Sequence, residues 1–429
     1  MNKHDTHRSD RYHQPAIFLH IYILLLIFSV SSQTHASEVS QQSCTATISN
    51  IQVAKAIPHD LEQKPAAGWH PVQKLPEYWN TRWPNYHATA WYKINFNYLC
   101  PQSTKTPISL VIKSMNMAGQ IYINDAFIWQ DQSLIEPVSR SWLKPRYWVI
   151  PAEILHPGEN TLWIRITGIA TQKSGLSNVN LGPHQAMMKL YQHYELELRT
   201  LSLLNMMINI VVGLLCFAVW FFTPKEVAFK WFGIVSLLWI SYVFLVQSTE
   251  TVFNISNTLQ DQISILVFCC YTVAGSIAAW RFARQKYPKI ELLLLIYIVS
   301  AFIFILLIPN VFLPKTLNLF FLIGVIIFLL KCISFPYIAY KSKNKEAYIL
   351  AIQYLIFIPI AINDAHYMIT LEGTILSPYT SPTSSILIGA ILALRLANNS
   401  KKIALFHKTL TDEVTKAKVE LSISLNAQH

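Results

Sequence analysis

The second half of the chain consists of long apolar runs separated by short polar loops, and this pattern restricts the fold more than any other feature. The runs are Leu201 to Phe222, Val227 to Val246, Ile263 to Trp280, Leu292 to Ile308, Leu317 to Ile338, Ala347 to Ile369, and Ser384 to Ala397. Most of them approach the length of about 20 residues that a helix needs to cross a bilayer. The sequence therefore predicts an all-α domain of seven transmembrane helices over residues 201–397.

Basic residues gather in every second loop of this region. The loops expected to face the cytoplasm and the segment after the last run carry Lys225, Lys230, Arg281, Arg284, Lys286, Lys289, Lys331, Lys341, Lys343, Lys345, Arg395, Lys401 and Lys402. The intervening loops, Gln247 to Gln262, Pro309 to Thr316 and Leu371 to Thr383, hold only Lys315. An excess of Lys and Arg marks the cytoplasmic side of a multi-pass protein. We therefore expect the segment before the first helix to lie outside the cytoplasm, and we attribute the net charge of +11 to topology and not to nucleic-acid binding.

Residues 1–36 have the features of a secretory signal peptide. Lys3, Arg8 and Arg11 precede an apolar stretch from Ile17 to Val30, and Thr34-His35-Ala36 offers a cleavage site. The alternative is an eighth transmembrane helix, which the shortness of the apolar stretch disfavours. The segment that follows is therefore expected to be exported.

Residues 37–190 alternate apolar and polar residues over short stretches. The strand candidates are Thr45 to Val53, Ala90 to Tyr98, Ile108 to Ile112, Gln120 to Ile123, Tyr147 to Ile150, and Thr161 to Ile166. Turn-forming residues separate them, as at Asn124-Asp125 and from His156 to Asn160. Many short strands without a helical period predict an all-β sandwich.

Cys44 and Cys100 lie in the segment expected to be exported, each at the edge of a predicted strand. An oxidising compartment would permit a disulfide between them, and two free thiols are the alternative. The remaining four cysteines lie in apolar runs, where we expect them to pack as small hydrophobic residues.

Two segments outside the predicted strands, "YWNTRWP" and "SRSWLKPRYW", alternate arginine with tryptophan. They supply the candidate ligand-binding residues Trp79, Arg82, Trp83, Arg140, Trp142, Arg146 and Trp148. Arginine beside aromatic rings can bind a carboxylate or phosphate, and indole rings can stack on sugars. The alternative is that these residues pack the sandwich or hold a loop, and we expect Trp91 and Trp163, inside strands, to lie in the core. No His, Asp and Glu cluster has metal-ligand spacing, so neither a metal nor a cofactor is expected.

A few polar residues interrupt the apolar runs, most notably Asn363, Asp364 and His366 near the outer end of the sixth run. Such groups are costly in hydrocarbon, so we expect them to face the bundle interior or water. A transporter would need more intramembrane carboxylates, or a matched pair of broken helices, than this sequence contains.

Residues 398–429 are polar with spaced apolar residues. Leu410, Val414, Ala417, Leu421 and Leu425 recur at intervals of three or four, which places them on one face of a helix. This face could form a parallel two-stranded coil and so a homodimer, and a solvated amphipathic helix is the alternative.

The segments "TAWYKINF", "GQIYINDAFIW" and "LHPGENTLWIRITG" resemble the jelly-roll, galactose-binding-like modules of sugar-active enzymes and membrane sensors. The order of the segments along the whole chain resembles that of the bacterial seven-transmembrane receptors with diverse intracellular signalling modules. It includes "GLSNVNLGP" and the connector "LYQHYELELR" before the first apolar run. The resemblance implies a signal peptide (1–36), a periplasmic sensory domain (37–190), a connector (191–200), a seven-transmembrane domain (201–397) and a cytoplasmic signalling helix (398–429). It also implies a location in the bacterial inner membrane.

A receptor of this kind would bind a small periplasmic ligand, a carbohydrate or carboxylate, and relay the signal to a separate cytoplasmic effector. The family's usual kinase and cyclase domains are not present in the sequence, so no enzymatic activity is expected. Because "LTDEVTKAKVELSISLNAQH" resembles the lead-in helix of sensor histidine kinases, a sensor kinase or, less favoured, a diguanylate cyclase without its catalytic domain is an alternative. A membrane transporter and a carbohydrate-binding membrane protein are the others. A sugar hydrolase would need two carboxylates at one cleft, and the exported segment has few acids.

Overall fold

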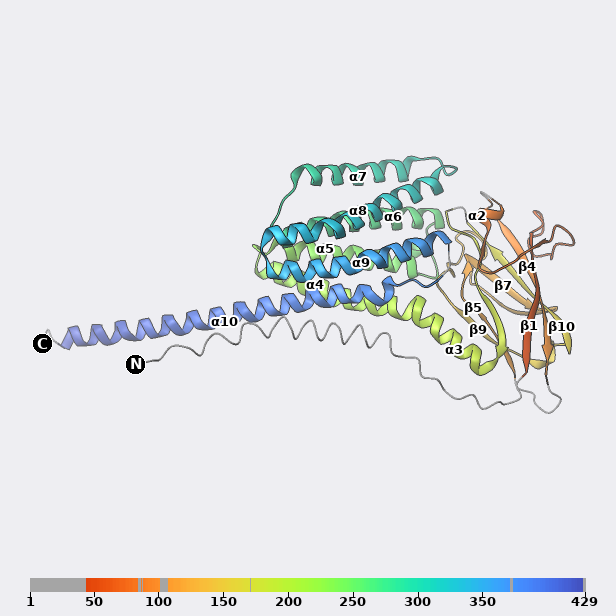
Figure 1. Ribbon diagram of the computed structural model, residues 1–429, viewed down its shortest axis with the longest axis horizontal. Helices are drawn as coiled ribbons and strands as arrows, with labels where there is room; N and C mark the ends of the chain where they lie inside the picture. Colours follow the sequence, from red (N-terminus) through yellow and green to blue (C-terminus); the bar gives the residue numbers. More distant parts are fainter. Residues whose placement is uncertain are drawn as a thin grey trace. The chain divides into compact units, whose positions relative to one another are not determined.

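The computed structural model describes residues 44–426, apart from residues 84, 85, 87, 101–106, 170, 371 and 372. The predicted signal peptide lies outside the described residues. The described chain begins with strands, continues through a helix that leads out of them, and ends in a set of long apolar helices (Figure 1).

The strands form one large antiparallel sheet and two small ones. The large sheet has the order β2-β1-β4-β10-β7-β8, made by His70–Pro71, Thr45–Lys55, Thr89–Leu99, Gly158–Thr167, Ala118–Ile123 and Ala126–Gln130. The small sheets have the orders β3-β11-β6 (Glu77–Tyr78, Gly175–Leu176, Met115–Asn116) and β12-β5-β9 (Val179–Pro183, Ile108–Ile112, Arg146–Ile150). All six predicted strands are present, and the predicted all-β sandwich is confirmed.

The core of the sandwich lies between the large sheet and the sheet that contains β5. Tyr92, Ile94 and Phe96 alternate along β4 and are fully buried against apolar residues of β5 such as Leu110. Residues that are two positions apart along a strand point to the same face of the sheet, so these three side chains all fill the face toward β5. Burial of side chains this large supplies most of the stabilisation of such a domain.

The two tryptophans expected in the core differ. Trp91 is fully buried and donates its indole N–H to the carbonyl of Leu61. Trp163 is only half-buried and packs edge-on against Trp69, with their ring centroids 5.6 Å apart. The prediction for Trp163 was therefore wrong, because alternation assigns residues to two faces without indicating which face is covered.

A disulfide joins Cys44 and Cys100, the pair that the sequence singled out. The two residues stand beside the paired ends of β1 and β4, where Thr45 lies opposite Leu99, and their Cα atoms are 4.2 Å apart. The bridge ties the beginning of the described chain to the middle of the large sheet.

Helix α3 (His184–Glu195) follows the last strand directly and continues through a π-helical turn, Leu196–Thr200, into α4 (Leu201–Phe222). The helices after α4 are α5 (Val227–Gln247), α6 (Asn257–Phe282), α7 (Pro288–Leu307), α8 (Leu313–Ser342), α9 (Lys345–Thr370) and α10 (Ser377–Asn426). Within the described part of the chain, seven helices are long and apolar enough to cross a membrane, which is the number predicted.

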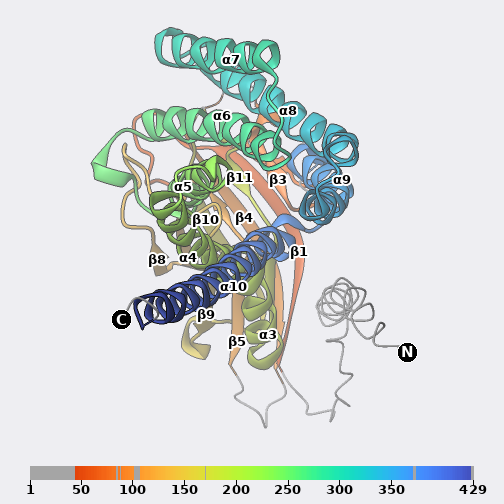
Figure 2. The ribbon, with the colours of Figure 1, turned by 90° about the vertical axis from the view of Figure 1, so that its left-hand side faces the viewer.

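Helices α7 and α10 lie at opposite sides of the bundle. Helix α7 contacts α6 and α8 at one edge of the bundle, whereas α10 contacts α4 and α9 on the other side (Figure 2). The outward surface of α7 is apolar, with Leu293, Phe304 and Leu307 exposed. Exposed apolar surface of this extent is unfavourable in water and favourable against lipid.

Helix α10 contains two predicted segments. The seventh apolar run and the tail helix after residue 398 are one helix of 50 residues (Figure 1). The part beyond the bundle is polar and exposed as far as residue 418, apart from residue 399, whose exposure is not described.

Lys331 corrects the prediction for the basic loops. It lies inside α8 and is 7% exposed, whereas Lys341, Lys343 and Lys345 do surround the turn between α8 and α9. Its ammonium stands 4.2 Å from the ring centroid of Phe328 and 4.7 Å from that of Tyr354. Aromatic faces attract a cation, so these two rings can accommodate the charge of Lys331 within the bundle.

Candidate functional site

The seven candidate ligand-binding residues fall into three separate places. Trp79 begins the short helix α2 (Trp79–Arg82) and Trp83 follows its end, and both pack with Tyr86, at centroid distances of 5.5 and 5.4 Å. Trp79 is buried and donates its indole N–H to the hydroxyl of Tyr92, at 2.9 Å. Arg82 forms an ion pair with Glu77. This first group therefore packs a loop onto the core, which agrees with the alternative that these residues pack the sandwich or hold a loop.

Arg146 and Trp148, on β9, form the second group. Arg146 donates to Asp131 at 2.7 Å and to Ser141 at 2.9 Å, and its guanidinium stacks on Trp129. Trp148 packs against the same Trp129 ring, with centroids 5.4 Å apart. Because Arg146 is 8% exposed and holds a carboxylate, its polar contacts are made inside the sandwich.

Arg140 and Trp142 form the third group, which faces the helical bundle. Arg140 is 2% exposed, and its guanidinium donates to Asp261 of α6 at 3.0 Å. Trp142 packs beside Met117 and Val138 in a small apolar cluster of its own. The sandwich segment that was predicted to bind a ligand thus contacts a predicted transmembrane helix.

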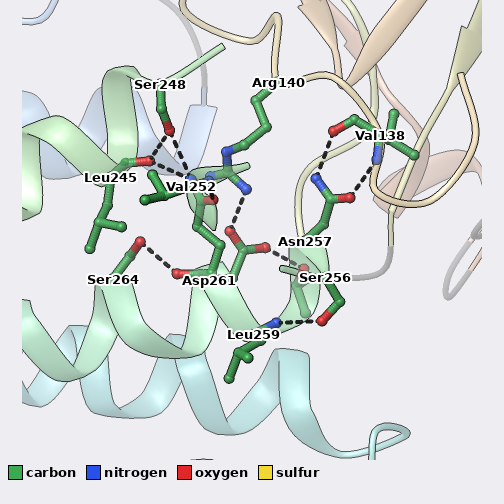
Figure 3. A network of polar contacts seen from close by, with 12 residues as sticks. Val138, Arg140, Leu245, Ser248, Val252, Ser256, Asn257, Leu259, Asp261 and Ser264 are labelled. Atoms are coloured by element: carbon green, nitrogen blue, oxygen red, sulfur yellow. Dashed lines mark hydrogen bonds and ion pairs between the residues drawn. The ribbon is translucent and has the colours of Figure 1, made fainter. Parts of the chain in front are cut away.

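Asn257, the first residue of α6, is central to this contact (Figure 3). Its side-chain oxygen accepts from the amide of Val138 at 2.6 Å, and its side-chain nitrogen donates to the carbonyl of the same residue at 2.8 Å. The backbone amide of Asn257 donates to Glu136 at 2.8 Å. A carboxylate at a helix N-terminus satisfies an otherwise unpaired amide and interacts favourably with the helix dipole.

The loop before α6 adds further contacts. Ser139 donates to both oxygens of Glu250, at 2.8 and 3.0 Å, and the amide of Arg140 donates to the carbonyl of Thr249 at 2.7 Å. Gln260, fully buried, donates to Ser248 and to the carbonyl of Leu245 and so holds this loop to the end of α5. We call the contact of residues 136–140 with residues 249–261 the α6 contact.

Burial determines the electrostatics of the α6 contact. Arg140 and Asp261 are 2% and 4% exposed, and the second oxygen of Asp261 accepts from the hydroxyl of Thr171. A buried ion pair strongly resists the loss of one partner, because the remaining charge is left without compensation. The α6 contact therefore fixes the position of the sandwich segment on the end of α6.

The polar residues predicted inside the sixth run have a local role. Asp364 accepts from the backbone amides of Leu376 at 2.7 Å and Ser377 at 2.9 Å, so it caps the beginning of α10. Asn363 donates to the carbonyl of Thr374 in the same turn, and His366 is exposed. A capping carboxylate explains why an acid is tolerated at this end of an apolar helix.

Helix α10 also contacts the bundle at two points farther along its length. The hydroxyl of Ser385 donates to Asn209 of α4 at 2.9 Å. Arg395 donates to Glu226 at 2.8 Å and to Glu346 at 2.7 Å, which join it to the segments before α5 and at the start of α9.

Sequence reasoning missed the partners of Arg140. Glu250 and Asp261 are the acids of an otherwise uncharged outer loop, and this was the available signal. The separation of 121 residues between Arg140 and Asp261 prevented their pairing from being deduced. Among the described residues, no cluster of His, Cys, Asp and Glu could hold a metal ion.

No protein-family model matches the chain, and no curated protein matches it. Among solved structures, the chain is similar to β-glucuronidases from an uncultured Clostridium sp. (16% identity, TM-score 0.23), Faecalibacterium prausnitzii (15%, 0.24) and Ruminococcus gnavus (15%, 0.26). The matches cover 32%, 31% and 34% of this chain and 24%, 22% and 29% of those proteins, so the chain spans about a quarter of their length. Likeness at this level supports no conclusion about fold or activity.

Proposed function

We propose that this chain is a membrane receptor of the kind it resembles, the bacterial seven-transmembrane receptors with diverse intracellular signalling modules. The sandwich lies in the periplasm, helices α4 to α10 cross the inner membrane, and the end of α10 presents the signal to a cytoplasmic effector. The observation that carries the proposal is the α6 contact, in which a buried ion pair joins the sandwich to a helix of the bundle.

The α6 contact supports signalling because it is specific and rigid. A tether between two independent domains would need neither buried charges nor paired backbone amides at the contact. Here a change in the sandwich segment at residues 136–140 necessarily acts on the N-terminus of α6. A receptor of this kind has two arrangements of the sandwich segment and α6 in equilibrium. A ligand that favours one arrangement would shift that equilibrium by its difference in affinity for the two.

The ends of the helices support the proposed orientation. The turns at the end of the bundle away from the sandwich carry Lys225, Arg284, Lys286, Lys289, Lys341, Lys343 and Lys345. On the sandwich side, the described loops between consecutive helices carry no Lys or Arg, and the first turn of α8 carries Lys315. Cytoplasmic loops are enriched in these residues, so the sandwich belongs outside.

The exposed face of the α10 tail supports a homodimer. Leu410 and Val414 are 46% and 49% exposed and lie one turn apart on the same face. In a parallel dimer the two faces would meet. Val414→Cys should therefore form a cross-link between two chains in membranes, and Lys416→Cys, on the opposite face, should not.

The receptor proposal can be tested with a chimera. The catalytic core of a histidine kinase is fused to the end of the chain, and its autophosphorylation is measured in membrane vesicles. Asp261→Asn is expected to change the output at least about twofold, a change of a few tenths of a kcal/mol in the signalling equilibrium. Asp125→Asn is the matched control, because Asp125 is fully exposed on the sandwich surface.

A second variant protects the test against misfolding. Ser139→Ala removes the hydroxyl's contacts with Glu250 and with the amide of Ser133, and leaves the Arg140 ion pair in place. The receptor proposal would fail if both junction variants inserted at the normal level and gave the same kinase output as the control.

A further inference from the structure

A cavity of about 210 Å³ lies where the sandwich meets the ends of four bundle helices, beside the α6 contact. Trp142 and Asn116 line it from the sandwich, Glu197 from the turn before α4, and Gln247 from the end of α5. Ser377 and Pro378, the first residues of α10, complete the wall. We call this space the junction cavity.

Four polar atoms of the junction cavity are buried and make no hydrogen bond among the described residues. They are the side-chain oxygen of Asn116, the indole nitrogen of Trp142, one carboxylate oxygen of Glu197 and the side-chain oxygen of Gln247. The Glu197 oxygen lies 3.4 Å from the ammonium of Lys113, an ion-pair contact without a hydrogen bond. Asn116 is 8% exposed and Glu197 is 1% exposed. Buried polar groups in folded proteins are nearly always paired, so four such atoms around one cavity indicate a polar occupant.

The orientation of the two amides is fixed by their other contacts. The side-chain nitrogen of Asn116 donates to the carbonyl of Lys173 at 2.9 Å, and that of Gln247 donates to the carbonyl of Leu198 at 2.8 Å. A carbonyl accepts only from a donor, so each amide presents its oxygen to the cavity. The four unpaired atoms are therefore three acceptor oxygens and one donor, the N–H of Trp142, and hydroxyl groups such as those of Ser114, Ser202 and Ser377 also line the cavity.

This donor and acceptor pattern selects the class of ligand. An anion brings only acceptors, which cannot pair with three acceptor oxygens. A cation would gain from Glu197, but the ammonium of Lys113 already stands 3.4 Å from that carboxylate. Hydroxyl groups can donate to the three oxygens and accept from the indole N–H.

The walls and the size limit the ligand further. Aromatic rings of Trp142, Trp239 and Tyr242 line the cavity and can pack against the C–H face of a compact ring. Burial raises the pKa of Tyr78, also in the wall, to about 12, so its phenol stays neutral. The volume lies below the roughly 300 to 1,000 Å³ of pockets for drug-sized molecules.

We propose that the junction cavity binds a small neutral polyhydroxylated molecule, of the size of a single sugar ring or cyclic polyol. The inference deepens the proposed receptor function, because the ligand would touch both the sandwich and the first turn of α10. Occupancy would then favour the arrangement of α10 in which its first residues close on the ligand.

The test is a direct binding measurement on the full chain in lipid nanodiscs. The probes are myo-inositol, D-glucose and D-xylose, with lactate and methylammonium as the anionic and cationic comparisons, each up to about 10 mM, well above the dissociation constant of about 1 mM that marks weak binding. We expect at least one of the three neutral probes to bind with saturation and to raise the unfolding temperature, because a ligand of the native state stabilises it.

Two matched substitutions locate the site. Trp142→Phe keeps an aromatic ring, although a smaller one, and removes the N–H; it should weaken binding roughly two- to tenfold, the effect of one neutral hydrogen bond. Trp163→Phe, on the outer face of the sandwich, is the same substitution outside the cavity and should leave affinity unchanged. Gln247→Met removes an acceptor oxygen and provides a second variant should Trp142→Phe fail to fold.

The inference is overturned if no neutral probe binds, which would mean that water satisfies the four atoms. It is also overturned if only lactate or methylammonium binds, or if Trp163→Phe weakens binding while Trp142→Phe and Gln247→Met do not. Since binding is measured without the kinase fusion, these outcomes are independent of the receptor test. A polyol that binds without changing kinase output would leave the site standing and refute the receptor function.

Discussion

The α6 contact and the junction cavity lie side by side between the sandwich and the bundle, yet they differ in how completely their buried polar atoms are hydrogen-bonded. At the α6 contact, Arg140, Asn257 and Asp261 are buried and hydrogen-bonded to partners across the junction, and among the described atoms of these three side chains only the Nε of Arg140 is buried without a partner. Around the cavity, Trp142 and Gln247 each keep a polar atom without a protein partner. We therefore expect a ligand at the incompletely paired side to act on the sandwich segment and the helix ends while the α6 contact holds them together.

The largest effect should come from the fixed side. Asp261→Asn removes the charge that compensates Arg140, and both residues are almost completely buried. Loss of one partner of a buried ion pair destabilises by about 3–5 kcal/mol. The midpoint of thermal unfolding in nanodiscs should therefore fall sharply. Exchange of the charges, Arg140→Asp with Asp261→Arg, should recover part of the loss, and a midpoint equal to that of the native chain in the single variant would contradict the assigned role of the α6 contact.

A smaller effect is expected on the cavity side. Lys113→Met leaves the carboxylate of Glu197 buried without its cation, but the present distances of 3.4 and 3.5 Å already describe a long contact. We expect a loss of about 1–3 kcal/mol, the range for leaving a buried polar group unpaired. Denaturant unfolding of the full chain measures it. A loss larger than that of Asp261→Asn would reverse the assignment of the fixed side.

The cap of α10 should contribute less again. Asp364→Ala leaves the amides of Leu376 and Ser377 without their acceptor and should destabilise the chain by about 1 kcal/mol. Asp412→Ala, on the exposed part of the same helix, is the control. Because the cap adjoins the cavity wall, hydrogen exchange should quicken at residues 376–380 in the first variant only, and equal exchange in the two variants would argue against the cap.

No measurable change is expected from Asp125→Ala. Asp125 is fully exposed and its ion pair with Lys64 is 3.3 Å long. Exposed pairs contribute little because water screens them. A clear drop in the unfolding midpoint here would mean that charge in general, and not buried pairing at the junction, controls the stability of this chain.

Sequence periodicity identified the elements well and their partners poorly. The bounds of α4 and β5 match the predicted runs to the residue, because a long apolar run and a short buried strand are local features. Trp163 was assigned to the wrong side, since period two defines two faces without indicating which one a neighbouring segment covers. Lys331 was assigned to a loop, since the aromatic rings that accommodate it belong partly to another helix.

The candidate site was predicted only in part. Arg140 and Trp142 were selected from a segment rich in arginine and tryptophan, and both lie at the junction. Their roles were not predictable, because Asp261 and Gln247 come from helices more than one hundred residues away in the chain. The same composition in Arg82, Arg146 and Trp148 serves packing inside the sandwich, so residue type alone did not separate the two uses.

The contacts of Ser385 and Arg395 with the bundle limit the motions that the tail of α10 can transmit. Ser385 and Arg395 hold the helix at points about 15 Å apart along its axis, so it cannot swing freely about one pivot. Both contacts are made by side chains of α10, so they also set the angular position of the helix about its own axis, and each residue of an α-helix turns the next by about 100°. A partner at the tail would then sense angular phase. Inserting residues one at a time after Ala397 should make the output rise and fall with the period of the helix.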